Sequence, residues 1–471
     1  MVWFVLSTGA LVVIWGVAAV AALRAARTSR TPQGAIGWVV FLLSAPMIAL
    51  PAFMVFGDHR FRGYWRARRA AERALLPRRA KTSALSEPPL TLPINPAPFE
   101  AIAGFKICRG NDMTLLVNGR QTFDSIFEAI DGAQEYILLQ YYILRSDSIG
   151  DQLHARLLAA AKRGVKIWMM VDKIGSRQLP RAYIEELEHA GIHLVAPGRY
   201  RRPWTRMRIN FRNHRKTVIV DGRIGFTGGI NVGDEYLGLS PTLSPWRDTH
   251  VRLSGPVVLQ LQLSFAEDWH WYTQEPILDH LHWEPHPGTE DRPALIAATG
   301  PGDAVGNGSM LYFSAITAAQ ERVWLASPYF VPDQEVSAAL QHASLRGVDV
   351  RILLPEKVDH YLPWLASFAF FDELQAAGVQ IYRYRDGFMH QKCFVVDETL
   401  SGVGTCNLDN RSFRLNFETM ALLFDQASAL DVAEMLERDF VNASDELEPL
   451  SQQKPLLRIM APMARLLAPV L

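Results

Sequence analysis

The sequence predicts an α/β protein of two fused, similar halves, each a mixed β-sheet flanked by helices, with a two-helix transmembrane hairpin at the amino terminus. Three observations support this fold class. The chain opens with two long uncharged runs, helix and strand signals alternate from about residue 133, and the same order of segments then returns in the second half. Alternating helix and strand signals are typical of a layered α/β architecture.

The transmembrane hairpin is predicted over residues 1–64. Residues 2–23 and 35–56 contain no charged side chain, and about 20 apolar residues span the hydrocarbon core of a bilayer. The alternatives are a signal peptide for the first run, a buried core helix for the second, and a shallow hairpin that does not cross the membrane. Three arginines lie between the runs and six follow within twenty residues of Phe56, which favours a cytoplasmic body.

A basic, proline-rich linker is predicted over residues 65–100. Five prolines fall within residues 86–99, and such a segment is stiff and extended. The soluble body follows, with its first half over residues 101–290 and its second half, which includes the carboxyl-terminal tail, over residues 291–471.

An internal repeat supports this division into halves. Three pairs of similar segments occur in the same order, at offsets of 186, 183 and 187 residues: "AQEYILLQYYI" from 133 with "AQERVWLASPYF" from 319, "RGVKIWMMVD" from 163 with "RGVDVRILLP" from 346, and "AGIHLV" from 190 with "AGVQIY" from 377. Nearly constant spacing over three matches predicts a duplicated domain.

The repeat also carries the pattern H-x-K-x4-D-x6-G-x-x-N twice. Its members are His214, Lys216, Asp221, Gly228 and Asn231 in the first half, and His390, Lys392, Asp397, Gly404 and Asn407 in the second. Because alternate residues of a strand share a face, each histidine should point the same way as its lysine, while residues 217–220 continue as core. Two copies at equivalent places predict a single cleft at a pseudo-two-fold interface.

These side chains suit an anionic, tetrahedral phosphorus centre. One imidazole can attack phosphorus and form a covalent phosphohistidine while the other protonates the leaving oxygen. The ordinary histidine pKa of about 6.5 allows either role near neutrality. The lysines and asparagines would stabilise the non-bridging oxygens, and the motif glycines would let the backbone approach the phosphate. With no carboxylate cluster or His-x3-His spacing beside the motifs, no metal or other cofactor is expected.

The two motifs resemble those of the phospholipase D superfamily, and the resemblance covers essentially the whole soluble part. With the apolar hairpin and the stretches "WRDTHVRLSGP" (246–256), "SPYFVPD" (327–333) and "NLDNRSFRLNFE" (407–418), the chain is similar to bacterial cardiolipin synthases. The resemblance implies a phosphatidyltransferase of the bacterial inner membrane that acts on phosphatidylglycerol and other anionic phospholipids. One phosphatidylglycerol would donate its phosphatidyl group to a second, giving cardiolipin and glycerol.

The resemblance also implies residue roles. His214 would be the nucleophile and His390 the acid and then the base, although the symmetry of the motifs leaves this order open. Acidic residues orient the imidazoles in the family, and the candidates are Asp248 in the first half and Glu418 in the second. Asp221 and Asp397 are counted with the catalytic motifs but are expected to brace the backbone or the lysines.

One position departs from the family pattern. A serine often follows the motif glycine, but here Gly229 and Thr405 occupy these positions. The first half therefore lacks the hydroxyl, and Thr405 is the candidate for a phosphate contact.

Two further segments are candidates for contact with lipid. Residues 199–216 contain seven arginines, one lysine and no acidic residue, interleaved with Trp204, Met207 and Phe211. Such a patch would attract anionic headgroups, although a solvated basic loop has the same composition. The tail, residues 455–471, would either contact the membrane interface or pack on the core, since three prolines oppose a long amphipathic helix.

Composition argues against some classes of protein. Forty-eight basic residues balance forty-eight acidic ones, so neither a general nucleic-acid binder nor a nuclease is favoured. The three cysteines are too few for a disulfide framework and are interpreted as core residues. The remaining alternatives are a membrane phospholipase D or a phosphatidylserine synthase, which differ only in the acceptor, and a non-catalytic membrane scaffold, which would not need two intact motifs.

Overall fold

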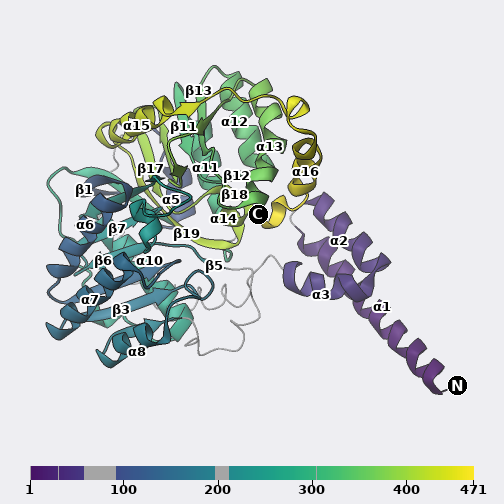
Figure 1. Cartoon of the computed structure of the whole chain (residues 1–471), viewed down its shortest axis with the longest axis horizontal. Coiled ribbons are helices and arrows are strands. Elements are labelled where there is room, and N and C mark those ends of the chain that lie inside the picture. Colours follow the sequence, from purple (N-terminus) through teal and green to yellow (C-terminus); the bar gives the residue numbers. More distant parts are fainter. Residues whose placement is uncertain (1, 30, 58–91, 197–211, 304) are drawn as a thin grey trace. The chain divides into compact units, whose positions relative to one another are not determined.

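The computed structural model of the chain describes residues 2–29, 31–57, 92–196, 212–303 and 305–471. It divides into two compact units (Figure 1). The first contains the apolar amino-terminal helices, and the second contains all described residues from 92 onward. The predicted linker up to residue 91, and residues 199–211 of the predicted basic patch with Trp204, Met207 and Phe211, lie outside the described residues.

The first unit contains α1 (Val2–Thr28), α2 (Pro32–Ser44) and α3 (Pro46–Phe56). Within α1, residues Leu11–Thr28 have the length and hydropathy of a membrane span. The second apolar run is broken, because Ala45 leaves the helical region ahead of Pro46, as expected for a residue that precedes proline. The 13 residues of α2 rise about 20 Å, short of the roughly 30 Å hydrocarbon core. Among the described residues, α1 is thus the one helix with the length and hydropathy of a membrane span, and a second span stays a prediction.

The second unit is built on one 16-stranded mixed sheet that runs through both halves. At its centre β1 (Cys108–Val117) pairs antiparallel with β10 (Arg292–Thr299). Outward from β1 lie β9 (Thr249–Ser254), β7 (Ile224–Gly228), β6 (Thr217–Val220), β2 (Tyr136–Tyr141), β3 (Lys166–Val171) and β4 (His193–Val195). Outward from β10 lie β19 (Asn416–Leu423), β17 (Leu400–Gly404), β16 (Cys393–Val396), β11 (Arg322–Ala326), β13 (Asp349–Pro355), β14 (Gln380–Tyr384) and β20 (Ala443–Ser444).

This strand order confirms the predicted duplication. From β1 to β4 and from β10 to β14, the two halves repeat the same sequence of antiparallel and then parallel neighbours. A pseudo-two-fold axis therefore passes between β1 and β10. The motif strands β6 and β16 occupy equivalent places on either side of it.

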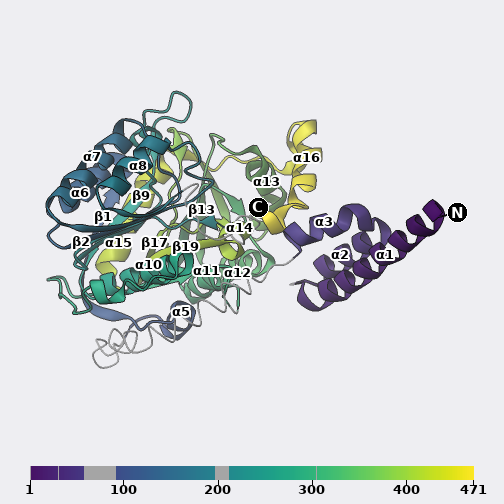
Figure 2. The same ribbon diagram turned by 90° about the horizontal axis from the view of Figure 1, so that it is seen from below.

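Helices cover both faces of the sheet (Figure 2). In the first half they are α5 (Ala97–Ala103), α6 (Asn118–Asp131), α7 (Ser148–Lys162), α8 (Arg181–His189) and α10 (Val257–Thr273), and in the second half α11 (Asn307–Ala318), α12 (Gln334–Leu345), α13 (Tyr361–Ala376), α14 (Asn410–Arg414), α15 (Gln426–Val441) and α16 (Pro455–Arg465). In β2, Tyr136 and Leu138 pack with α10, whereas Ile137 and Leu139 pack with α6, α7 and α8. Strands buried on both faces explain the continuous apolar runs in the sequence.

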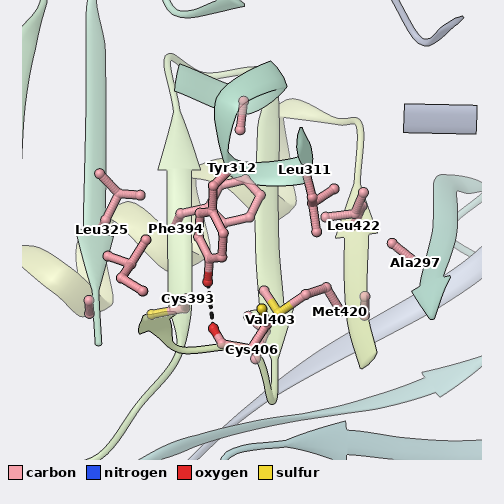
Figure 3. Close-up of a cluster of buried hydrophobic side chains, with 14 of the residues drawn as sticks. Ala297, Leu311, Tyr312, Leu325, Cys393, Phe394, Val403, Cys406, Met420 and Leu422 are labelled. Atoms are coloured by element: carbon pink, nitrogen blue, oxygen red, sulfur yellow. Dashed lines mark hydrogen bonds between the residues drawn. The ribbon is translucent and has the colours of Figure 1, made fainter. Parts of the chain in front are cut away.

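The core of the second half supports a motif loop. Tyr312 of α11 packs edge-on against Phe394 of β16, with ring centroids 5.6 Å apart, and its hydroxyl donates to the carbonyl oxygen of Cys406 at 2.6 Å (Figure 3). Cys406 directly precedes Asn407 of the motif. All three cysteines are buried, and burial raises the pKa of the Cys108 thiol to about 12.

The tail folds as α16 and a short 3-10 turn (Ala468–Val470). Pro455 stands in the first turn of α16, where its missing N–H has no helical partner to lose, while Pro462 lies inside the helix. The helix is only eleven residues long and packs along α13 (Figure 1).

Candidate active site

Each motif histidine is held by the backbone of the opposite half. Two short parallel pairs cross between the halves: β5 (Arg212–Asn213) with the start of β19, and β15 (Phe388–Met389) with β8 (Trp246–Arg247). The N–H of His214 donates to the carbonyl oxygen of Phe417 at 3.0 Å, and the N–H of His390 donates to that of Arg247 at 2.7 Å. These bonds set each histidine beside the carboxylate that follows on the other strand.

The two imidazoles are paired with carboxylates across the halves. His214 Nδ1 lies 2.9 Å from Glu418 Oε2, and His390 Nδ1 lies 2.8 Å from Asp248 Oδ2. Asp248 and Glu418 occupy equivalent positions, each two residues before the strand partner of its half's motif glycine. The structure thus brings together the histidines and the carboxylates predicted from the sequence, and it pairs them in a crossed arrangement.

Burial sets the protonation state of these pairs. Desolvation lowers the pKa of both His214 and His390 to about 4, although the carboxylates act in the opposite direction. Burial alone would raise the pKa of Asp248 and Glu418, but the neighbouring histidines and lysines hold both below their ordinary values. At neutral pH a neutral imidazole therefore donates its Nδ1–H to an ionised carboxylate, which leaves the lone pair on Nε2.

Both motif lysines are fully buried behind their histidines. Lys216 Nζ donates to the carbonyl oxygen of His214 at 2.7 Å. Lys392 Nζ donates to that of His390 and also lies 2.9 Å from His390 Nδ1. Desolvation lowers the pKa of Lys216 to about 7 and that of Lys392 to about 8. Neither side chain lines the cavity described below, so in this conformation the ammonium groups act on the imidazoles rather than on the cavity surface.

The motif aspartates, which were expected to brace the backbone or the lysines, lie at the far ends of β6 and β16 and do not line the cavity. Asp221 accepts the backbone N–H groups of residues 134–136, each at 2.8 Å. Asp397 accepts those of residues 320–322 at 2.8–3.0 Å. Both residues adopt left-handed φ angles, 52° and 50°. Their carboxylates therefore brace the backbone at the starts of β2 and β11.

The motif glycines make room for a neighbouring strand. A Cβ on Gly228 would lie 2.5 Å from the backbone of His250, and a Cβ on Gly404 would lie 2.1 Å from the carbonyl oxygen of Thr419. His250 belongs to β9, which begins directly after Asp248, and Thr419 belongs to β19, which contains Glu418. These glycines therefore allow the close approach of the neighbouring strand.

The residues after these glycines contact the carboxylates. The Thr405 hydroxyl donates to Glu418 Oε2 at 2.5 Å and is fully buried, and Thr405 is not among the residues that line the cavity described below, so its contact with phosphate stays a prediction. In the first half, a Cβ on Gly229 would lie 1.9 Å from Asp248 Oδ1. Asp248 instead accepts the Thr249 N–H at 2.8 Å and the Trp246 indole N–H at 3.3 Å. Different donors thus stabilise the two carboxylates.

Two buried arginines fix the backbone around the carboxylates. Arg215 pairs with Asp268 of α10 at 2.7 Å and donates to the carbonyl oxygen of Glu418. Arg247 pairs with Asp439 of α15 at 2.7 Å and donates to the carbonyl oxygen of Asp248. Arg215 was counted in the predicted basic patch, but its burial and its pairing with Asp268 keep it from meeting a lipid headgroup. Arg247, which directly precedes Asp248, was given no role from the sequence.

A cavity of about 720 Å³ contains both halves of the site. Its wall includes His214, His390, Asn231 and Asn407, together with apolar side chains and the charged residues Arg145, Arg212, Asp234, Glu235, Asp359, Asp409 and Arg411. Asn231 accepts the Ile143 N–H through Oδ1 and donates to the Tyr236 hydroxyl, and Asn407 donates to Asp409. The predicted histidines and asparagines therefore share one cavity.

The cavity wall also carries aromatic side chains and Arg411, to which the sequence alone gave no role, and Arg212 of the predicted basic patch. Tyr142 packs edge-on against the His214 imidazole at 5.0 Å between ring centroids, and Trp246 lies 5.2 Å from that of His390. Arg212 and Arg411 line the same cavity as His214, so the wall carries two cationic side chains. Burial and the nearby Arg212 lower the pKa of the Arg411 guanidinium. Arg411 stood in the quoted 407–418 stretch, but only the fold shows that it reaches the site.

The described part of the chain contains no group of three or more His, Cys, Asp or Glu side chains arranged to hold a metal ion. The two crossed pairs, His214 with Glu418 and His390 with Asp248, hold two titratable side chains each.

Comparisons with known proteins agree with this site. Residues 126–269 and 312–441 match the family model described as "Cardiolipin synthase, PLD-like domain". Cardiolipin synthase A of Pseudomonas fluorescens is 44% identical over 462 residues, covering 96% of each chain. Cardiolipin synthase A of Pseudomonas putida is 42% identical over 465 residues, covering 96% of this chain and 95% of the relative.

Among solved structures, the phosphatidylserine synthase of Haemophilus influenzae superposes with a TM-score of 0.60. It is 14% identical and covers 80% of this chain and 99% of that one, which supports the fold alone. The family model, in contrast, matches one segment in each half and each segment contains one crossed histidine. The chain belongs to the cardiolipin synthase family of phospholipase D-like proteins.

Proposed function

We propose that the chain is a phosphatidyltransferase that makes cardiolipin and glycerol from two molecules of phosphatidylglycerol. The observation that carries this proposal is the pair of imidazoles on one cavity wall, each with Nδ1 bonded to a carboxylate of the opposite half. Such a pair can hold a nucleophile and a general acid on opposite sides of one phosphorus atom. The near full-length relatives named cardiolipin synthase A support this choice of reaction.

In the first step, His214 Nε2 attacks the phosphorus of the donor phosphatidylglycerol. The bond from phosphorus to the glycerol headgroup breaks, and His390 gives its Nε2 proton to the departing oxygen. The bound phosphate anion raises the pKa of His390 from its low value in the free enzyme, so substrate binding itself favours the protonated acid. The assignment of the nucleophile to His214 follows the family pattern.

In the second step, a hydroxyl of the second phosphatidylglycerol attacks the phosphatidyl group on His214. Neutral His390 now accepts the proton of this hydroxyl, the phosphorus–nitrogen bond breaks, and cardiolipin leaves. Glu418 and Asp248 stabilise whichever imidazole carries positive charge. Asn231, Asn407 and the cationic Arg212 and Arg411 are proposed to hold the non-bridging oxygens.

The protein is proposed to work at the bacterial inner membrane with its body in the cytoplasm. The apolar α1 and the arginine excess after Phe56 support this placement. Phosphatidylglycerol and other anionic phospholipids are the proposed membrane partners, while the even balance of acidic and basic residues argues against nucleic acid.

The test is a product analysis. The full chain is incubated with phosphatidylglycerol vesicles and a chelator, beside His214→Ala, His390→Ala and the control His342→Ala, whose side chain is exposed on α12. We expect cardiolipin and glycerol in equal amounts from the native chain and the control, and neither product from the other two variants. Lipid label bound covalently to protein in His390→Ala but not in His214→Ala would identify the nucleophile.

Other products would overturn the proposal. Phosphatidate with glycerol would make the chain a hydrolase that uses water as the acceptor. Phosphatidylserine formed from an activated donor and serine would make it a phosphatidylserine synthase. Turnover that survives both histidine substitutions would place the chemistry elsewhere in the molecule.

A further inference from the structure

We propose that the outer face of α16 and the first turn of α13 form a bilayer-docking surface that sets the cavity mouth against an anionic lipid surface. The inference rests on the proposed function, because only a lipid substrate requires the cavity to open onto a bilayer. The occupant of the surface is the membrane itself.

The first observation is that α16 turns its larger apolar side chains outward. Its outer face consists of Leu456, Ile459, Met460 and Met463, extended by Leu466 and Leu467, all exposed. Three of these, Leu456, Ile459 and Leu466, are 73%, 66% and 72% exposed. Their three- and four-residue spacing makes one continuous stripe on a helix. A helix that only completed a soluble core would present the opposite pattern.

The second observation is that the inner face already has its partner. Small residues, Ala461 and Ala464, are buried toward the body. Arg465 donates to the carbonyl oxygen of Ala369 on α13 at 3.1 Å, and its guanidinium lies over the Phe370 ring at 4.6 Å. The helix is therefore fixed along α13, while its apolar stripe has no partner among the described residues of the second unit.

Charge selects an anionic surface over a neutral one. Residues 452–471 contain Lys454, Arg458 and Arg465 and no acidic side chain. Lys454 and Arg458 are exposed beside the outer face. Cationic residues that flank an apolar helical stripe are the pattern that lies in the interface of an anionic membrane.

Residues beside this surface also line the cavity, which links the surface to the reaction. In the first turn of α13, His360 and Pro363 line the cavity, whereas Tyr361 between them is 72% exposed. Past α16, Leu471 also lines the cavity, and its carbonyl oxygen accepts the Arg411 N–H. The exposed apolar side chains thus lead from α16 and α13 directly to the cavity wall. A lipid could then place its headgroup in the cavity while its acyl chains stay in the bilayer.

The experiment uses the full chain in vesicles and a readout besides activity. All three native cysteines are buried, and burial raises their thiol pKa values, so a new exposed cysteine is labelled selectively. Ile459→Cys is compared with Leu345→Cys and Val441→Cys, which replace side chains of similar or greater exposure on α12 and α15. Each carries an environment-sensitive fluorophore, and the vesicles contain phosphatidylglycerol with or without a lipid-borne quencher.

We expect a blue-shifted label at residue 459 that the lipid quencher reaches, and water-exposed labels at residues 345 and 441. Vesicles of neutral lipid alone should weaken the shift at 459. A label at 459 that a water-soluble quencher reaches as easily as at 345 would overturn the proposal. A blue shift that persists in detergent and grows with protein concentration would instead assign the face to a second copy of the chain.

Kinetics give an independent check. The double variant Ile459→Glu with Met463→Glu should lose about tenfold or more activity on vesicles but keep its activity on a short-chain, monomeric phosphatidylglycerol. Equal loss on both substrates would reject docking as the cause. If the label at 459 enters lipid while no cardiolipin is made by any form, the docking surface stands and the proposed reaction fails.

Discussion

The crossed carboxylates are the residues on which the two histidines depend most. Glu418 and Asp248 accept the Nδ1–H of an imidazole from the other half, at 2.9 and 2.8 Å. An ionised carboxylate here fixes the tautomer and stabilises the imidazolium that forms during the reaction. Each half therefore supplies one reactive ring and the support for the other ring.

Replacing Glu418 by Gln should lower kcat about 10²–10⁴-fold with little change in KM, because the charge that stabilises the His214 imidazolium is lost while the cavity is not altered. Steady-state kinetics on phosphatidylglycerol measure both constants. Glu437→Gln, exposed on α15, is the matched control and should behave as the native chain. A rise in KM alone would show that Glu418 serves binding rather than the histidine.

Thr405 offers a finer test of the same pair. Its hydroxyl donates to Glu418 and helps to hold the carboxylate pKa low. Thr405→Val should reduce kcat about tenfold and leave KM unchanged, because a net hydrogen bond to a charged group contributes roughly 1.5–3 kcal/mol. Thr405→Ser should restore most of the rate. A selective rise in KM in the valine variant would instead favour a contact with phosphate.

The activity should extend unusually far into acid. His214 must be neutral to attack phosphorus, and its pKa of about 4 keeps it neutral well below pH 6.5. Because His390 must enter the first step protonated and its pKa in the free enzyme is also about 4, kcat/KM should be largest near pH 4 and decrease at higher pH, with a further decrease near 7–8 as Lys216 and Lys392 lose their protons. A pH–rate profile checks this, and a maximum near pH 6.5 would contradict it.

The folded protein, in contrast to its activity, should become less stable in the same acid range. Between about pH 6.5 and 4, the unfolded chain binds protons at His214 and His390 that the folded chain does not bind. The free energy of unfolding should therefore decrease as the pH falls through this window. Thermal melting of the native chain beside His390→Ala would show a smaller decrease in the variant.

At the scale of elements, the motif aspartates join strands rather than perform chemistry. Asp221 ties β6 to the start of β2, and Asp397 ties β16 to the start of β11, each through three backbone N–H groups. Asp is among the few side chains that tolerate left-handed φ angles. An aspartate at each position can therefore both adopt the left-handed φ of the turn and accept the backbone N–H groups at the start of the neighbouring strand.

Asp397→Ala should lower the free energy of unfolding by about 1–3 kcal/mol, because three backbone N–H groups lose a charged acceptor. The kcat of the molecules that remain folded should not change, since the carboxylate is away from the cavity. Denaturant unfolding and active-site titration separate these effects. Asp124→Ala, exposed on α6, should leave both quantities unaltered, and a lost kcat at full stability in Asp397→Ala would restore a catalytic role.

At the scale of the molecule, one sheet joins the halves through β1 and β10. The crossed backbone pairs add to this junction, and each half alone lacks one member of both histidine–carboxylate pairs. Separation would expose two long edge strands, which favour aggregation or non-native pairing. The halves are therefore one folding and catalytic unit.

Residues 92–290 and 291–471 produced separately should each be inactive and associated in solution, whereas their co-expression should recover activity. Size-exclusion chromatography, circular dichroism and cardiolipin synthesis provide the measurements. A monomeric first half with its own cooperative melting transition would contradict this expectation.

Much of the fold and the site could be predicted because it depends on local patterns. Apolar strands next to amphipathic helices define the α/β class, and the near-constant offset of the segments reveals the duplication. The spacing of His214, Lys216, His390 and Lys392 alone pointed to phosphoryl chemistry. Hydrophobicity alone did not predict that the second apolar run is divided at Pro46 into two helices, α2 and α3.

The sequence by itself thus determined the fold class, the repeat, the motif histidines and the first apolar span. Only the tertiary structure decided that Glu418 serves His214, that Asp248 serves His390, and that Thr405 bonds to Glu418. The physical reason is distance along the chain. His214 and Glu418 are separated by 204 residues and His390 and Asp248 by 142, so no local period links them, and their pairing follows from strand register across the pseudo-two-fold axis.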